Sequence, residues 1–420
     1  MITAVTPPVA STTGREIEHA DELLVTLGRA LHQAGLPSHR LEAMLGRMAA
    51  RLGTKVHAFS LPTGLLLCIG RGRDLKTVLV RLPPRPTDLG RLRLLMIEAE
   101  ALADGRTHPA ESVTRIEALS TSAPGRHDRM AQFAGLALSA AAFSVFFGGG
   151  VRELLVAATV GIVVGLLALA TRGRRGASRR YELMAATAAG LIATMADRHL
   201  GGFEHWIPLA SGLIVLLPGL ALVDAIEELA NGHLTSGAAR MAGVGIVFLA
   251  LVFGVMMGVS LARFEGESPS RGPGTPFPPW AALPALGVVA LGSVCRFRAR
   301  LQDWPVILMA SAVAYFGAKM GSRLGNPLLG PFVGALVLGL AANLYSRYRL
   351  PIPQLLLVPG LALLVPGSIG LRSLDALLSG DTAMGVEHGF RMFMMAMALV
   401  AGLLFSNALV RTPANDYDTL

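Results

Sequence analysis

The chain has 420 residues, of which 52% are hydrophobic and 15% are charged, and its mean hydropathy is +0.54. These values exclude an ordinary soluble protein and indicate a polytopic membrane protein. The net charge of +9 does not predict a nucleic-acid partner, because the densest basic run, between positions 172 and 180, lies in a short loop between two apolar segments.

The two cysteines and the start of the chain exclude several other classes. Cys68 and Cys295 form neither a disulfide framework nor a cluster of metal ligands, and we expect no cofactor. The first twenty residues lack a basic stretch followed by an apolar one, so we expect no cleavable signal peptide.

Residues 1–125 have the pattern of a soluble α+β domain. Apolar residues recur at helical spacing between positions 23 and 52, and two apolar runs flank the turn at Pro62-Thr63-Gly64. The expected order after the first two helices is strands at 55–60, 65–69 and 77–82, then helices at 88–103 and 109–119, then a polar linker at 122–129.

From Met130 onward the sequence is a series of apolar segments. We count ten, at about 131–148, 152–171, 182–197, 206–230, 239–262, 280–295, 304–321, 327–346, 352–370 and 386–409. A helix needs roughly twenty residues to cross the hydrocarbon core, and the third and sixth segments are shorter than that. We therefore predict about ten transmembrane helices, in two groups of five at 130–262 and 280–410.

The loops between these segments alternate in charge. Basic residues precede the first segment and follow the second, sixth and eighth, whereas the intervening loops are mixed or acidic. Basic loops face the cytoplasm, so both termini and the amino-terminal domain are predicted to be cytoplasmic. Because five is odd, the second group must enter the membrane from the opposite side, which predicts an inverted repeat.

Two Pro-Gly pairs and the glycines around them share one spacing. Pro218-Gly219 and Pro366-Gly367 each interrupt an apolar segment, and 366 exceeds 218 by 148. The same offset of 148 relates the glycines at 212, 232, 237 and 254 to those at 360, 380, 385 and 402. Paired helix breaks in matching halves are typical of binding sites in secondary transporters, because irregular backbone at membrane depth must face protein or water.

A Pro-Gly break changes the hydrogen bonding of a helix. It leaves unpaired amides at the new helix start, which suit a carboxylate, and free carbonyls before the break, which suit an ammonium group or a cation. An amino acid offers both groups, so we predict substrate binding by Pro218, Gly219, Asp224, Pro366, Gly367 and Ser368. The alternative is that the prolines only kink the helices for packing.

Two carboxylates follow the first break. Asp224 and Glu228 are four residues apart and share one helix face, at a depth where charge is costly and usually functional. We predict that they couple transport to protons, while an ion pair of Glu228 with Arg240 is the structural alternative. Structural or gating roles are assigned to Arg240, Gly232, Gly237 and Gly380. Polar residues of the second half that are equally compatible with interfacial anchoring are Arg372, Asp375, His388 and Arg391.

Several motifs together resemble one known family. They are Ala34–Glu42, Phe59–Gly64, Phe146–Gly149, Leu217–Leu222, Glu228, Gly232, Ser236-Gly237, Arg240 and Leu364–Ser368. In this order, over nearly the whole chain, they are similar to the bacterial threonine/serine exporter family. The resemblance implies a ten-helix carrier of the bacterial inner membrane that exports threonine and serine, is driven by the proton-motive force, and has a cytoplasmic amino-terminal domain. That family usually has Asp in place of Glu228 and an amide in place of Asp224, which leaves the proton-carrying carboxylate open.

Two other functions stay open for residues 1–125. One is a membrane-anchored hydrolase, but His57 and Ser60, three positions apart on a strand, would lie on opposite faces of the sheet. The other is a regulatory gate. We expect a transporter and not an enzyme, with an amino acid, protons and the lipid bilayer as partners, and the sequence leaves open whether the chain forms homo-oligomers.

Overall fold

The computed structural model describes residues 14–70, 75–83, 86–121, 126–171, 177–200, 204, 206–263, 275–349 and 352–410. The first 13 residues, the predicted loops around 122–125, 172–176 and 264–274, and the side chain of Asp375 lie outside the described residues. The chain divides into an amino-terminal unit, up to about residue 122, and a helical unit that follows it.

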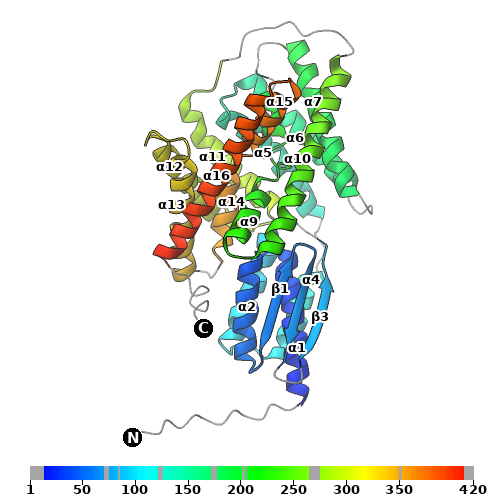
Figure 1. Cartoon of the computed structure of the whole chain (residues 1–420), viewed down its shortest axis with the longest axis vertical. Coiled ribbons are helices and arrows are strands. Elements are labelled where there is room, and N and C mark those ends of the chain that lie inside the picture. The colour runs from blue at the N-terminus through cyan, green and yellow to red at the C-terminus, as the bar shows by residue number, and fades with distance from the viewer. Residues whose placement is uncertain are drawn as a thin grey trace. The chain divides into compact units, whose positions relative to one another are not determined.

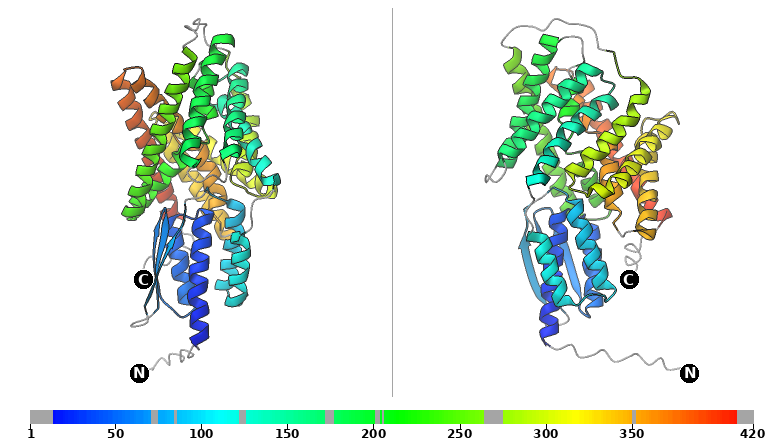
Figure 2. Two further views of the ribbon diagram at one scale, coloured as in Figure 1. Left: turned by 90° about the vertical axis from the view of Figure 1, so that its right-hand side faces the viewer. Right: turned by 180° about the vertical axis from the view of Figure 1, so that it is seen from behind.

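The amino-terminal unit combines helices with a three-stranded antiparallel sheet of order β1-β2-β3. Its elements are α1 (Gly14–Ala34), α2 (Ser38–Arg51), β1 (Val56–Leu61), β2 (Gly64–Ile69), β3 (Lys76–Arg81), α3 (Leu89–Ala103) and α4 (Pro109–Thr121). Figure 2 shows the helices on one side of the sheet, where α1 and α2 pack against the strands. Leu65, Leu67 and Ile69 alternate along β2 and are buried on that side, whereas Leu79 on the outer face is 73% exposed.

Strand β1 separates the two residues that a hydrolase would need. His57 is exposed on one face, whereas Ser60 is buried on the other and donates its amide to Oε1 of Glu42 at 2.9 Å. Because the two side chains lie on opposite faces of the sheet, they make no nucleophile–base pair.

The helical unit holds the apolar segments of the chain (Figure 1). Its helices are α5 (Arg126–Phe146), α6 (Val151–Thr171), α7 (Ala177–Leu200), α8 (Trp206–Gly212), α9 (Gly219–Ala230), α10 (Leu234–Arg263), α11 (Ala282–Arg296), α12 (Trp304–Ser322), α13 (Leu329–Tyr348), α14 (Gln354–Leu364), α15 (Gly367–Leu378) and α16 (Thr382–Leu409). Short 3₁₀ turns precede α11, at Pro279–Ala281, and α12, at Leu301–Asp303.

Six helical segments among the described residues are long and apolar enough to cross a membrane. They are Val151–Thr171, Leu234–Ala262, Pro279–Arg296, Leu329–Tyr348, Gln354–Ser373 and Thr382–Leu409. The number is below the predicted ten partly because α8 and α9 are separated by a break, and α7 carries charged residues at both ends. The six segments identify a polytopic helical membrane protein.

Both predicted Pro-Gly pairs stand where one helix ends and another begins. Residues 213–218 form a turn between α8 and α9, and only Val365 and Pro366 separate α14 from α15. A third pair, Pro359-Gly360, lies inside α14. Ile214 and Leu363, each close to one break, pack against the same apolar cluster of α5 and α11.

Each break is followed by a helical hairpin, and the two hairpins have the same size. The first hairpin consists of α9 and α10, and the second hairpin consists of α15 and α16. Helices α9 and α15 have 12 residues each, and the starts of α9 and α10 precede those of α15 and α16 by 148 positions. Gly232 and Gly380 both have φ = +84° in the hairpin turns. Figures 1 and 2 show α9 and α15 toward opposite ends of the helical unit.

Replacing Gly232 or Gly380 with Ala should lower the free energy of unfolding by about 1–2 kcal/mol, because a side chain strains a residue in the left-handed region. Nothing lies within 4 Å of a Cβ atom added at either position, so the cost is conformational and not steric. Thermal unfolding of the purified protein in detergent measures the loss.

Gly243→Ala in α10 is the matched control. Its added Cβ atom also meets nothing within 4 Å, but the backbone there is helical, so Ala should be neutral or stabilising. Equal unfolding temperatures for the Gly232 and Gly243 variants would contradict the strained turn.

Candidate functional site

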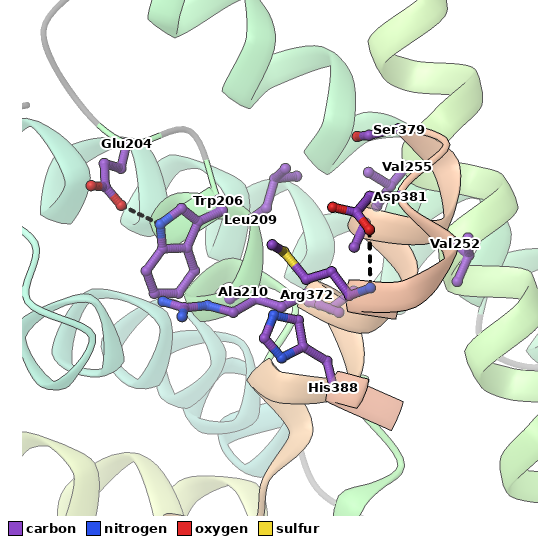
Figure 3. Close-up of a pocket in the computed structure, with 13 residues that line it drawn as sticks. Glu204, Trp206, Leu209, Ala210, Val252, Val255, Arg372, Ser379, Asp381 and His388 are labelled. Carbon is purple, nitrogen blue, oxygen red and sulfur yellow. Dashed lines mark hydrogen bonds between the residues drawn. The ribbon is translucent and has the colours of Figure 1, made fainter. Parts of the chain in front are cut away.

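A pocket of about 460 Å³ lies in the helical unit, beside the second hairpin (Figure 3). Its wall comes from α8, α10, α15 and α16, from the turn between α15 and α16, and from the residue shortly before α8. The lining residues are Glu204, Trp206, Leu209, Ala210, Val252, Val255, Leu371, Arg372, Ala376, Ser379, Asp381, Met384 and His388. Most of the lining is apolar, with a few charged and polar groups, which is the composition of small-molecule sites.

The guanidinium of Arg372 is held by an aromatic ring. Its Cζ atom lies 3.7 Å from the centroid of the Trp206 ring, and the Trp206 indole N–H donates to the carboxylate of Glu204. Such cation–π contacts orient a guanidinium while leaving its N–H donors available. Among the residues whose side chains the structure describes, Arg372 makes no hydrogen bond or ion pair besides this ring contact.

A second nitrogen donor or acceptor lies at the same pocket. His388 in α16 is half-buried, and its Nδ1 atom is buried with no hydrogen-bond partner among the described residues. Figure 3 shows the side chains of Trp206, Arg372 and His388 gathered at one side of the pocket. At the start of α16 the carboxylate of Asp381 accepts from the amide of Met384 at 3.0 Å, which fixes the hairpin turn.

The first hairpin contains an ion pair between Glu228 and Arg240. At the offset of 148, the equivalent residues of the second hairpin are Ala376 and His388, which line the pocket. Glu228 is 1% exposed, and Arg240 donates to both of its oxygens, from Nη2 to Oε1 at 2.8 Å and from Nε to Oε2 at 3.2 Å. The hydroxyl of Ser236 donates to Oε2 at 2.9 Å. A bidentate pair of this kind is strong in a buried setting and leaves the carboxylate well satisfied.

Asp224 differs from Glu228 although it lies one turn away. It is half-buried, and no hydrogen bond to its carboxylate is found within the part of the chain that the structure describes. The guanidinium of Arg240 is near enough to attract it electrostatically. Asp224 is therefore an acceptor that a bound ligand could use.

The two breaks contact one another reciprocally. A Cβ atom added at Gly219 would overlap Cγ1 of Val365, and one added at Gly367 would lie 3.1 Å from Cβ of Leu217. Each glycine thus faces the residue before the other proline. One carbonyl freed by the first break, that of Val215, accepts from Nη2 of Arg296 in α11 at 2.9 Å. Each glycine leaves room for the side chain that comes before the other break, so the two breaks can approach closely.

The structure brings some predicted residues together and separates others. Glu228 and Arg240 form the ion pair that the sequence left as the structural alternative, with Asp224 nearby. Gly237 packs so closely that a Cβ atom would lie 2.8 Å from the carbonyl of Ala225. The residues at the two breaks are not part of the pocket wall: Pro218, Gly219, Pro366, Gly367 and Ser368.

Sequence reasoning missed the pocket itself. It left a functional role and interfacial anchoring equally open for Arg372 and His388, and it did not single out Trp206 or Glu204. The available signal was the pair of charged residues in the second hairpin at the positions of Asp224 and Arg240 in the first.

Comparisons with known proteins identify the family of the chain. The model of the threonine/serine exporter family, ThrE, matches residues 22–262 and 273–410. The threonine/serine exporter of Corynebacterium glutamicum is 23% identical over 323 residues, which cover 73% of this chain and 64% of that protein.

Fungal proteins are also similar. An uncharacterised protein of Schizosaccharomyces pombe is 26% identical over 390 residues, covering 87% of this chain and 49% of its own length. The pheromone-regulated membrane protein 10 of Zygosaccharomyces rouxii is 23% identical over 296 residues, covering 63% of this chain and 30% of its own. The chain thus spans about half of the first of these fungal relatives and less than a third of the second. No solved structure matches the chain.

The residues that the family model matches include nearly all of the amino-terminal unit, both helix breaks, and the residues that form the ion pair and the pocket wall. The resemblance seen in the sequence motifs is thereby confirmed, and the chain belongs to the threonine/serine exporter family.

Proposed function

We propose that this protein is a secondary active transporter that exports small hydroxy amino acids, threonine or serine, from the cytoplasm by alternating access around two broken helices. Family membership and the membrane-spanning helices support a membrane exporter. The observation that carries the substrate class is the pocket of about 460 Å³ with the guanidinium of Arg372 in its wall, for which no ion-pair partner is found among the described side chains.

The chemistry of the pocket suits an amino acid. The guanidinium of Arg372 presents a planar pair of donors to a carboxylate, and the Nδ1 atom of His388 offers a further bond. The carboxylates of Glu204 and Asp381 lie in the same wall and suit an ammonium group. The volume is within the range of about 300–1,000 Å³ that small-molecule pockets occupy.

In the proposed architecture the protein crosses the membrane ten times, in two inverted groups of five helices at 130–262 and 280–410. A cytoplasmic α+β domain of residues 1–125 precedes them. Equal hairpins at an offset of 148 and the reciprocal contact of the two breaks support the repeat. The proposed location is a bacterial inner membrane, and the positive-inside rule supports termini on its cytoplasmic side. The pocket then opens outward, in the form from which an exported amino acid leaves.

The broken helices and the two carboxylates have separate roles in this mechanism. The contact of Gly219 with Val365 is the pivot about which the two hairpins exchange positions. Asp224 and Glu228 couple the exchange to protons, because a buried carboxylate next to one guanidinium changes its partners when it is protonated. Gly232, Gly237 and Gly380 shape the hairpins.

Counterflow in liposomes tests the substrate class. Purified protein in vesicles loaded with unlabelled threonine should accumulate labelled threonine, and unlabelled serine should compete. Lactate, which has the carboxylate and hydroxyl groups but lacks the ammonium group, is the matched control and should compete weakly. An imposed pH gradient should then drive net threonine movement.

Vesicles without protein, and vesicles with protein loaded with an unrelated sugar, give the background. Absence of threonine and serine counterflow above that background, with folded protein present, would overturn the proposed function. Equal competition by lactate would show that a carboxylate, and not an amino acid, is recognised.

A further inference from the structure

The two hairpins share their backbone hydrogen bonds as well as their length. The amide of His233 donates to the carbonyl of Glu228 at 2.9 Å, and at the same offset the amide of Asp381 donates to Ala376 at 3.0 Å. The amide of Gly237 donates to His233 at 2.9 Å, as that of Gly385 does to Asp381 at 3.0 Å. The hairpins are therefore two copies of one backbone with different side chains.

The helices around the hairpins are also matched. Helix α15 packs against α8 and α10, and α9 packs against α14 and α16, which are their equivalents at the offset of 148. Every pocket residue of the second hairpin thus has a counterpart in the first. The offset relates Arg372, Ala376, Met384 and His388 to Asp224, Glu228, Ser236 and Arg240, and it relates Trp206 to Gln354.

The counterpart positions carry ligand-binding groups that the protein does not fully use. Gln354 is 4% exposed, and its Oε1 atom is buried with no hydrogen-bond partner among the described residues. A buried amide oxygen without a partner is destabilising, so it needs an explanation. The carboxylate of Asp224 has no hydrogen bond among the described residues either.

Glu228 is the equivalent of Ala376 at the offset of 148. Ala376 has no carboxylate and lines the open pocket, whereas Glu228 places a carboxylate at the corresponding position of the first hairpin. This carboxylate is bound by two nitrogens of Arg240 and by the hydroxyl of Ser236. A guanidinium binds the carboxylate of an amino acid in the same bidentate manner. Glu228 is thus a carboxylate of the protein held where a substrate carboxylate would bind.

We infer that Asp224, Arg240 and Gln354 form a second binding site for the transported amino acid, equivalent to the pocket and facing the other side of the membrane, with Glu228 holding the place of the substrate carboxylate. This inference rests on the proposed function, because it takes the pocket as an amino-acid site and the hairpins as inverted copies. The substrate carboxylate displaces Glu228 from Arg240, while Asp224 and Oε1 of Gln354 accept from the ammonium group.

Side-specific kinetics test the second site. Threonine transport is measured in vesicles of uniform orientation, with the substrate added on one side and then on the other. Gln354→Leu keeps the size of the side chain and removes the amide oxygen. It should raise the apparent KM by about tenfold or more on the side of the first hairpin only. Asp224→Asn should do the same, and Arg372→Lys should raise KM on the opposite side only.

Ser311→Ala in α12 is the control. The Ser311 hydroxyl is buried, and among the described residues its one hydrogen bond is to the carbonyl of Ile307 in its own helix. This substitution should change neither KM. Thermal unfolding checks that each variant folds. If Gln354→Leu does not fold, Asp224→Asn is used as the test of the second site.

Three results are decisive. Wild-type transport with unchanged KM on both sides in Gln354→Leu and Asp224→Asn would overturn the second site and leave the proposed function standing. A rise of KM on both sides alike would overturn it as well, because it would indicate one shared site. Failure of the wild type to transport any amino acid would overturn both the second site and the proposed function.

Discussion

Replacing Arg372 with Gln should raise the KM for threonine by roughly ten- to a hundredfold, because a hydrogen bond to a charged group contributes about 1.5–3 kcal/mol. Gln keeps a polar side chain of similar length but loses the planar positive charge that binds a carboxylate. The turnover number should change less than KM, since in the proposed function Arg372 binds the substrate and does not form the contact between the breaks. Initial rates of threonine counterflow over a range of concentrations measure both quantities.

Arg391→Gln is the matched control for this prediction. Arg391 is exposed in α16, one turn beyond His388, and is not part of the pocket wall. It removes the same charge from the same helix hairpin and should leave KM within about twofold, as surface substitutions usually do. Equal effects of the two substitutions would show that Arg372 acts only through the surface potential.

Replacing Gly219 with Ala should destabilise the protein by about 1–3 kcal/mol and abolish most transport, because the added methyl group overlaps Val365 at the contact between the two breaks. Helix packing in membranes depends on such small residues. Val365 is β-branched and its Cβ atom would lie only 3.2 Å from the added carbon, so rotation of its side chain relieves the overlap poorly. The unfolding temperature in detergent and the counterflow rate measure the two effects.

Val365→Ala provides the rescue. The double variant Gly219→Ala/Val365→Ala should recover most of the lost stability, with a coupling energy above about 0.5 kcal/mol in a double-mutant cycle. Gly367→Ala should be milder than Gly219→Ala, because its methyl group would lie 3.1 Å from Leu217 and a small shift relieves that contact, whereas the methyl group at position 219 would overlap Cγ1 of Val365. A Gly219→Ala protein with the stability and rate of the wild type would refute the contact.

Two Pro-Gly pairs of the second half could be the repeat partner of Pro218-Gly219, namely Pro359-Gly360 and Pro366-Gly367. Pro-Gly-Leu-Ala-Leu occurs at 218–222 and again at 359–363, so local identity would pair Pro218 with Pro359. The glycine spacing favours Pro366 instead, and the structure agrees, because Pro359 lies inside α14 while Pro366 lies at the break. A register of several spaced glycines was the better guide, since each glycine meets a separate packing demand.

Whether Glu228 and Arg240 form an ion pair could not be decided from the sequence alone. Glu228 and Arg240 are far enough apart in sequence that the same residues could serve a solvated helix end or a buried site. The turn at Gly232, with φ = +84°, reverses the chain so that α9 and α10 lie together and the guanidinium reaches both oxygens of Glu228. The residue types alone could not distinguish the two outcomes.

The sequence by itself determined the membrane class, the order of helices and strands in residues 14–121, the positions of both helix breaks and the offset of 148. These depend on hydropathy, on local periodicity and on the missing amide of proline, which act within a few residues. Only the tertiary structure decided that the breaks touch and that Trp206 holds the guanidinium of Arg372. It alone showed that Glu228 occupies in one hairpin the position that is open in the other. Those contacts join segments that are distant in the chain, so they depend on how whole helices pack and not on any local preference.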